Sequence, residues 1–164
     1  MNRRHFLTRS FAFGCALASG VFASLAARAE HTFEAFTLSE DAWRKKLTPQ
    51  QFRILRKEGT ERPYTSELNE EKREGIYACA GCGLDLFPSS YKFDSGTGWP
   101  SFYDAIDGHI GTKTDYKLLV PRTEYHCARC GGHHGHVFED GPEPTGLRYC
   151  NNGAVLTFTP KDEA

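Results

Sequence analysis

The sequence predicts one mainly β domain, built from antiparallel strands and preceded by two short helices. From Gly75 onward, Gly, Pro, Asp and Asn recur about every 8–12 residues and divide the chain into short segments, which is typical of all-antiparallel proteins. Two segments before Gly75 carry helix-capping signals. The composition, 39% hydrophobic and 25% charged over 164 residues, is that of one soluble globular domain with an extension.

The extension is residues 1–29, and the domain is expected to comprise residues 30–164. Arg3 and Arg4 form a basic start, an apolar stretch of small residues follows, and Ala-Arg-Ala at 27–29 is typical of a signal-peptide cleavage site. The opening Asn-Arg-Arg-His-Phe-Leu-Thr resembles a twin-arginine signal. Such a signal would export the folded protein to a bacterial periplasm.

Two other interpretations of the N-terminus are weaker. The apolar stretch of about 16 residues (11–26) is shorter than the roughly 18–20 that a membrane-spanning helix needs. Lipid attachment at Cys15 lacks a Leu three residues earlier. Removal of the signal leaves 16 basic against 21 acidic residues. A net charge near −5 argues against nucleic acid or anionic lipid as a partner.

Two helices are expected at the start of the domain. In the segment 39–47, Ser39 can cap the N-terminus, and acids in the first turn and bases in the last complement the helix dipole. In the segment 48–59, Thr48 precedes a Pro at the first helical position, and Gly59 follows the last helical residue. We expect both helices to cover one side of a sheet.

Three short runs are the expected strands: Ile76-Tyr-Ala78, Lys117-Leu-Leu-Val120 and Ala154-Val-Leu-Thr-Phe-Thr159. The turn residues between them predict antiparallel pairing. No internal repeat is visible apart from two Cys-x-x-Cys pairs.

Four of the six cysteines form two matching Cys-x-x-Cys-Gly turns, Cys79/Cys82 and Cys127/Cys130. Each turn can present two thiolates to one metal, so the four predict one tetrahedral, structural Zn²⁺ site per chain. The 44 residues between the pairs exceed the usual spacing, so two hairpins must meet in space. Two disulfides or a redox-active pair are the alternatives. Four thiolate ligands leave no open position for a substrate, so catalysis must depend on other residues.

Cys150 is the remaining cysteine of the domain. The simplest interpretation is a buried, unreactive residue. However, Arg148, Asn151 and Asn152 flank it, and cationic or hydrogen-bonding neighbours can lower the pKa of a thiol from about 8.5 toward neutrality. The sequence therefore indicates a candidate nucleophile without naming its reaction.

Histidines and one aromatic loop are the other unusual features. His133, His134 and His136 follow the second cysteine turn, where they could form a second metal site or a polar turn. Few carboxylates lie near them, which argues against a catalytic metal. In the loop 94–102, two Gly and a Pro hold Trp99 in a rigid segment, where its ring could fill the core or line an apolar pocket.

Four motifs run through the chain in order: Cys79-x-x-Cys82, Ser95-Gly-Thr-Gly-Trp-Pro-Ser-Phe102, Cys127-x-x-Cys130-Gly-Gly-His-x-Gly-His-Val-Phe138-x-Asp-Gly-Pro and Thr145-Gly-Leu-Arg-Tyr-Cys-x-Asn152. Over residues 38–160 the chain resembles methionine sulfoxide reductases of type B. Several motifs in register are far more specific than any single Cys-x-x-Cys pair. The resemblance implies two antiparallel sheets, a structural Zn²⁺ and stereospecific reduction of methionine-R-sulfoxide, mainly in oxidised proteins.

The resemblance also implies roles for individual residues. Cys150 falls at the family's nucleophile, His133, His136 and Asn152 at catalytic positions, and Trp99 at the substrate-binding position. Cys150 would attack the sulfoxide sulfur, a histidine would protonate the oxygen, and Cys150 would be left as a sulfenic acid. Trp99 would pack against the S-methyl group, and Asn152 would orient a histidine or the oxygen.

One position departs from a common family pattern. Many members have a recycling cysteine where this chain has Thr97. With four cysteines assigned to Zn²⁺, none remains to form a disulfide with Cys150. An external thiol, thioredoxin-like or small, is therefore expected to reduce the sulfenic acid, and a monomer is expected. The alternative function is a non-catalytic zinc-ribbon binding module that uses Trp99 and the histidine loop for recognition.

Overall fold

The structure, a computed structural model, describes residues 33–163, so the predicted signal at 1–29 and its cleavage after Ala29 lie outside the described residues. No helix among the described residues has the length and apolar character needed to cross a bilayer. The α-helices of this part of the chain are α1 (Glu40–Lys46) and α2 (Pro49–Lys57). Its short 3-10 helices are η1 (Glu67–Asn69), η2 (Ser89–Tyr91), η3 (Gly153–Val155) and η4 (Lys161–Glu163). Its strands are β1 (Gly75–Cys79), β2 (Asp85–Pro88), β3 (Lys92–Phe93), β4 (Ser101–Phe102), β5 (Ile110–Asp115), β6 (Arg122–Cys127), β7 (His133–Phe138), β8 (Arg148–Asn151) and β9 (Leu156–Pro160).

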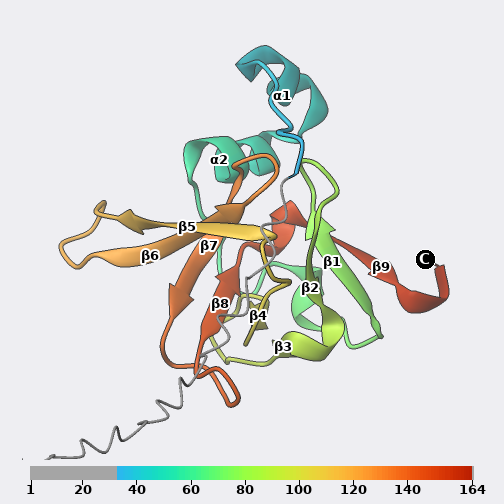
Figure 1. Cartoon of the computed structure of the whole chain (residues 1–164), viewed down its shortest axis with the longest axis vertical. Helices are drawn as coiled ribbons and strands as arrows, with labels where there is room; N and C mark the ends of the chain where they lie inside the picture. The colour runs from blue at the N-terminus through green and yellow to red at the C-terminus, as the bar shows by residue number, and fades with distance from the viewer. Residues whose placement is uncertain (1–32, 164) are drawn as a thin grey trace, which may run out of the picture.

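The strands form two antiparallel sheets (Figure 1). The smaller has the order β2-β1-β9, and the larger has the order β3-β4-β8-β7-β6-β5. The predicted mainly β fold of two antiparallel sheets with short N-terminal helices is confirmed. Strands distant in sequence are neighbours in both sheets, since β1 pairs with β9 and β4 pairs with β8. A site that draws on several of these strands therefore forms only when the whole domain folds.

Both predicted helices form with the expected N-terminal caps. The Ser39 hydroxyl accepts a backbone N–H of the first turn of α1 at 3.3 Å, and Thr48 and Gln51 form a reciprocal capping box at the start of α2. At the end of α2, Glu58 rather than Gly59 adopts the left-handed conformation, with a φ of 52°. Helix α2 packs against β7 and η3, whereas α1 stacks on α2 at the outer end of the molecule (Figure 1). The expected cover of the sheet is thus provided by α2.

Two of the three strand predictions hold. The run at 76–78 lies within β1. The run at 154–159 is right in part, because Ala154 and Val155 belong to η3 and the strand begins at Leu156.

The strand predicted at 117–120 is wrong, because these residues form the turn between β5 and β6. The β5–β6 hairpin projects beyond the rest of the larger sheet (Figure 1). Leu119, in the turn of this hairpin, is 104% exposed. An apolar run without alternation does not by itself distinguish a strand from other conformations. Lys113 and Lys117 pair with Glu58 at the end of α2 and so tie the hairpin to the helix.

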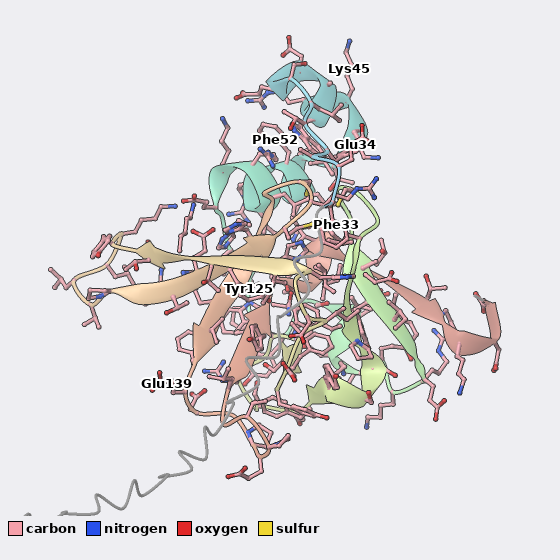
Figure 2. All side chains as sticks on the ribbon, in the orientation of Figure 1. Phe33, Glu34, Lys45, Phe52, Tyr125 and Glu139 are labelled. Atoms are coloured by element: carbon pink, nitrogen blue, oxygen red, sulfur yellow. The ribbon has the colours of Figure 1, made fainter. Side chains whose placement is uncertain are left out.

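Aromatic rings fill the space between the sheets. Phe87 of β2 stacks on Phe102 of β4 with centroids 4.3 Å apart, and Tyr77 of β1 meets Phe102 edge to face at 5.0 Å. Tyr125 of β6, which is labelled near the centre of Figure 2, is fully buried and also contacts Phe87. The core occupies the inner face of the larger sheet, which leaves the outer face for polar side chains.

Candidate functional site

Four cysteines from the two predicted turns gather where the end of β1 meets the end of β6. Cys79, Cys82, Cys127 and Cys130 form this cysteine cluster, and their sulfur atoms all lie within 4.8 Å of one another. The Sγ–Sγ distances of 3.7 Å (Cys79–Cys130) and 3.5 Å (Cys82–Cys127) are far longer than the roughly 2.05 Å of a disulfide. Zn–S bonds of about 2.3 Å place the corners of a tetrahedron about 3.8 Å apart. The cluster therefore fits one tetrahedral metal ion.

Hydrogen bonds from two arginines close the cysteine cluster. Arg56 of α2 donates to the carbonyl of Cys130 at 2.9 Å, and Arg129 donates to the carbonyl of Cys82 at 3.2 Å. Three of the four cysteines are buried. The cluster thus joins both sheets and helix α2, and four thiolates around one ion leave no coordination position for a substrate.

Cys150 lies apart from this cluster, on the outer face of the larger sheet. The register places Ser101 of β4 opposite Cys150 of β8, Cys150 opposite His136 of β7, and His136 opposite Glu124 of β6. Directly opposite residues in antiparallel strands point to the same face, with Cβ atoms about 4.5–5.5 Å apart. The half-buried thiol therefore lies between a hydroxyl and an imidazole.

A β-bulge brings a second histidine to the outer face. The register between β6 and β7 shifts after Tyr125, which leaves His134 as an extra residue. Residues three apart in a regular strand face opposite sides, yet here the rings of His133 and His136 lie 5.6 Å apart. His134 instead points into the core beside Tyr125, and burial lowers its pKa to about 3. The three histidines thus do not gather around one point.

Two carboxylates lie beside the histidines of the outer face, and one of them, Asp115, forms a hydrogen bond. Asp115, the last residue of β5, accepts a hydrogen bond from His136 Nε2 at 2.8 Å and one from Arg122 at 2.5 Å. The pKa of Asp115 is held well below its usual range, chiefly by a backbone N–H of the following turn and by His136. Asp115 is therefore ionised at neutral pH. Glu124 Oε1 lies 3.1 Å from Nδ1 of His133, whose pKa is lowered chiefly by burial, so this ring is neutral at neutral pH.

The Cys150 thiol differs from the sequence-based prediction. Burial is the largest influence and raises its pKa above the ordinary value, while the Arg148 guanidinium and the Thr97 hydroxyl act in the opposite direction. Arg148 also donates to both carboxylate oxygens of Asp140, at 2.7 and 2.8 Å. The predicted fall of the pKa toward neutrality is wrong for the free protein, because desolvation outweighs a cation that already has a carboxylate partner. The resting thiol is protonated at neutral pH.

The loop of the Ser-Gly-Thr-Gly-Trp motif covers one side of the thiol. Ser95 Oγ lies 2.8 Å from both Thr97 Oγ1 and Ser101 Oγ, so a chain of hydroxyls runs from Thr97 to the residue opposite Cys150. Trp99 follows in the same loop, and its ring lines one wall of an open groove of about 1260 Å³. Cys150 does not line this groove, whereas Trp99 does.

Asn152 is buried, and both ends of its amide bind backbone. Its Oδ1 accepts the N–H of Glu61 at 2.9 Å, and its Nδ2 donates to the carbonyl of His134 at 2.8 Å. Both hydrogen-bond partners of the Asn152 amide are backbone groups, one of them the carbonyl of His134, and its expected role toward a histidine or a substrate oxygen stays a prediction. Asn152 fixes the segment that follows Cys150.

Sequence reasoning missed three carboxylates of this region: Glu61, Asp115 and Glu124. Each is buried and engages its partners through register or loop packing rather than through sequence spacing. Asp115 and Glu124 reach the histidines only because β5, β6 and β7 are neighbours in the sheet. No local pattern would have identified any of the three.

Together these features define a class of protein: a mainly β domain with a four-cysteine cluster that fits one metal ion and, apart from it, one half-buried cysteine beside histidines on the outer face of an antiparallel sheet. The chain belongs to the SelR family, the methionine sulfoxide reductases of type B, because the family model described as SelR domain matches residues 47–160. As a member of this family it is an oxidoreductase that reduces methionine sulfoxide.

Individual relatives agree with this assignment. The chain is 51% identical over 131 residues to the peptide methionine sulfoxide reductase MsrB of Methanosarcina barkeri, with 79% of this chain and 92% of that protein covered. It is 56% identical over 121 residues to the MsrB of Thiobacillus denitrificans, with 73% and 92% covered. It is 49% identical over 136 residues to the MsrB of Bradyrhizobium diazoefficiens, with 82% and 98% covered. The resemblance is confirmed, and the alternative of a non-catalytic binding module is set aside.

Proposed function

We propose that Cys150 reduces protein-bound methionine-R-sulfoxide by nucleophilic attack on the sulfoxide sulfur. The observation that carries the proposal is the cross-strand row, in which Cys150 is paired with His136 and His136 is hydrogen-bonded to Asp115. A thiol needs a nearby base to become a nucleophile, and a departing oxygen needs a proton. Cys150 and His136 supply both within one face of the sheet.

The proton balance of this reaction suits a protonated thiol. Cys150–SH and the sulfoxide give Cys150–SOH and methionine: the substrate S–O bond breaks, an S–O bond forms on Cys150, and the thiol proton ends on that oxygen. The sulfoxide sulfur gains two electrons, and the thiol sulfur loses two. Nε2 of His136 is hydrogen-bonded to Asp115. Nδ1 is therefore the nitrogen proposed to accept the thiol proton and to return it to the sulfoxide oxygen.

Trp99 and Asn152 are proposed to serve binding and support, respectively. A sulfoxide has one polar and one apolar substituent, so discrimination between epimers needs an apolar wall, and the half-buried Trp99 ring is the candidate. The backbone contacts of Asn152 support a positioning role for it.

We propose that the cysteine cluster holds one structural Zn²⁺ through Cys79, Cys82, Cys127 and Cys130. The sulfur separations and the all-thiolate donor set support this ion. When bound, the ion supplies folding energy rather than chemistry.

Regeneration is proposed to use an external thiol, thioredoxin-like or small, that attacks Cys150 directly. Thr97 lies where a recycling cysteine would be needed, and the other described cysteines belong to the cluster. After one equivalent of substrate, a dimedone-type probe should trap a sulfenic acid on Cys150. The assay should use separated R and S epimers, and mass spectrometry should find the adduct only with R. A disulfide between Cys150 and a cluster cysteine, with loss of metal, would contradict the proposal.

Substitution of Thr97→Cys tests the proposal by adding the recycling cysteine that the chain lacks. The Thr97 hydroxyl lies at the thiol, so a cysteine there should form a disulfide with Cys150 and hide the sulfenic acid from the probe, provided the Cα atoms come within about 7 Å. Turnover with thioredoxin should then improve. Thr97→Ser is the matched control and should leave trapping unchanged.

We also propose a periplasmic monomer exported by the twin-arginine route. The proposal rests on the signal-like residues 1–29, and the acidic charge of the remaining chain argues against nucleic acid as a partner. N-terminal sequencing of the protein from a periplasmic fraction should find a chain that begins at Glu30. A chain that retains Met1 in the membrane fraction would contradict it.

A further inference from the structure

Glu61 is a buried carboxylate outside every helix and strand. It lies in the connection that follows α2, and only 4% of its surface is exposed. Its two carboxylate oxygens accept the N–H groups of Gly153 at 2.6 Å and of Ala154 at 2.8 Å. These donors open η3, directly after the strand that carries Cys150. Burying a carboxylate costs free energy unless it is hydrogen-bonded, so such a residue calls for an explanation.

The backbone of Glu61 makes two further contacts. Its N–H donates to Asn152 Oδ1 at 2.9 Å, and its carbonyl accepts the indole N–H of Trp99 at 3.3 Å. One residue therefore joins the segment after Cys150 to the ring proposed to bind the substrate.

The contacts explain why a carboxylate is needed at this position. The two oxygens of the carboxylate give each of the two adjacent N–H groups its own acceptor. Glutamine has the same shape, but its NH₂ group would face one of the N–H groups. The Gly153 backbone that donates to Glu61 also lies close to Ser66, because a Cβ added at Gly153 would lie 2.0 Å from Ser66 Oγ.

We propose that Glu61 is a positioning residue, which anchors its loop to the segment after Cys150 so that its carbonyl holds the Trp99 ring at a fixed place relative to the thiol. The inference rests on the proposed role of Trp99 in binding the S-methyl group. Glu61 then contributes to substrate affinity and epimer choice without touching the substrate. Its loss should raise KM while leaving the chemistry at Cys150 nearly unchanged.

The test is a double-substitution cycle of Glu61→Gln and Trp99→Phe, assayed on a methionine-R-sulfoxide peptide. Glu61→Gln should raise KM about ten-fold and change kcat less than about two-fold. The rate of Cys150 alkylation should stay the same. In the Trp99→Phe protein, Glu61→Gln should have almost no further effect on KM, because residues that act through one another are not additive. Equal effects of Glu61→Gln in both backgrounds would overturn the proposal.

Fluorescence gives a readout that does not depend on activity. The chain has two tryptophans, so a Trp43→Phe protein reports on Trp99 alone. In that background Glu61→Gln should shift the Trp99 emission, and unchanged emission would count against the proposal. If Trp99→Phe itself leaves KM unchanged, the substrate-binding role of Trp99 fails, which is separate from a failure of Glu61.

A variant that retains both acceptors guards against misfolding. Should Glu61→Gln fail to fold, Glu61→Asp is measured in its place, because it keeps two oxygens but withdraws them by one methylene. An intermediate rise in KM with shifted Trp99 emission is the expected result. Wild-type KM and emission in Glu61→Asp would show that Glu61 serves only the fold.

Discussion

The same residue type forms two chemically opposite sites in this protein. In the cysteine cluster every thiol has other thiols within 4.8 Å, and arginines of α2 and of the second turn cap the surrounding carbonyls. Cys150 does not belong to the cysteine cluster. Its thiol instead interacts with Arg148 and Thr97, and His136 is its cross-strand partner. The cluster lies at the ends of strands, where two turns of different sheets meet. Cys150 lies within a strand, on a face that the core does not use.

The role of a cysteine in this protein follows from what its sulfur atom faces. Sulfur atoms at tetrahedral spacing favour a metal, which keeps the thiolates from reacting. A single thiol beside a base and a cation can become a nucleophile when substrate arrives. Substitutions in the cysteine cluster should therefore lower stability, whereas substitutions at Cys150 or at its neighbours should lower activity.

The largest expected effect comes from breaking the cysteine cluster. Cys79→Ser or Cys127→Ser should give insoluble or unfolded protein, because metal-binding energy on the order of 10 kcal/mol at a structural site is folding energy. Metal analysis should find one Zn²⁺ per wild-type chain and much less in the variants, and circular dichroism should show the loss of structure. A metal-free preparation that stays folded and fully active would show that the cysteine cluster does not stabilise the fold through a metal.

Loss of the proposed nucleophile should have the opposite effect: activity should fall while the fold stays intact. Cys150→Ser should abolish reduction of methionine-R-sulfoxide while the melting temperature and the Zn²⁺ content stay close to wild type, because the side chain is half-buried and lies outside the cysteine cluster. Parallel activity assays and thermal unfolding check both statements. Activity above a trace would show that another group attacks the sulfoxide.

A smaller effect is expected from the carboxylate that holds His136. Asp115→Asn should lower kcat/KM about 10- to 100-fold, because the ring loses its ionised partner and its orientation, while general acid–base catalysis as a whole contributes about 10²- to 10⁴-fold. Asp162→Asn, at an exposed aspartate in η4, is the matched control. Equal activity of the two variants would show that Asp115 contributes only to the structure of the β5–β6 hairpin.

The same variant predicts a pH dependence of stability. The folded-state pKa of Asp115 is depressed, so its ionisation stabilises the protein above the pKa of the unfolded chain. This contribution is lost as the pH falls through the folded-state pKa. The difference in unfolding free energy between wild type and Asp115→Asn should therefore be largest near neutral pH and should shrink in strong acid, as measured by denaturant titrations.

The smallest expected effect concerns the thiol itself. The Thr97 hydroxyl lowers the pKa of Cys150, so Thr97→Val should raise it and move the pH profile of alkylation to higher pH. At neutral pH, alkylation should slow about two- to ten-fold, the value of one hydrogen bond. Iodoacetamide kinetics across pH check this. A profile that moves to lower pH would mean that the hydroxyl does not stabilise the thiolate.

The local features of this protein could be predicted from its sequence alone. Helix caps at Ser39 and Thr48, the strand at 76–78 and the two Cys-x-x-Cys turns were predicted correctly, because each depends on residues a few positions apart. The ordered motifs around Cys150 also identified the family. The run at 117–120 failed for the same reason, since apolar character alone does not say whether a neighbouring strand is there to pair with.

The assembly of the site depends on the tertiary structure and could not be predicted from the sequence. The bulge after Tyr125 turns His133 outward and His134 into the core, and sheet register brings Asp115 to His136. Desolvation at Cys150 likewise reverses the pKa shift that its sequence neighbours favour. Register, burial and loop packing are sums over residues far apart in the chain, so no local pattern encodes them.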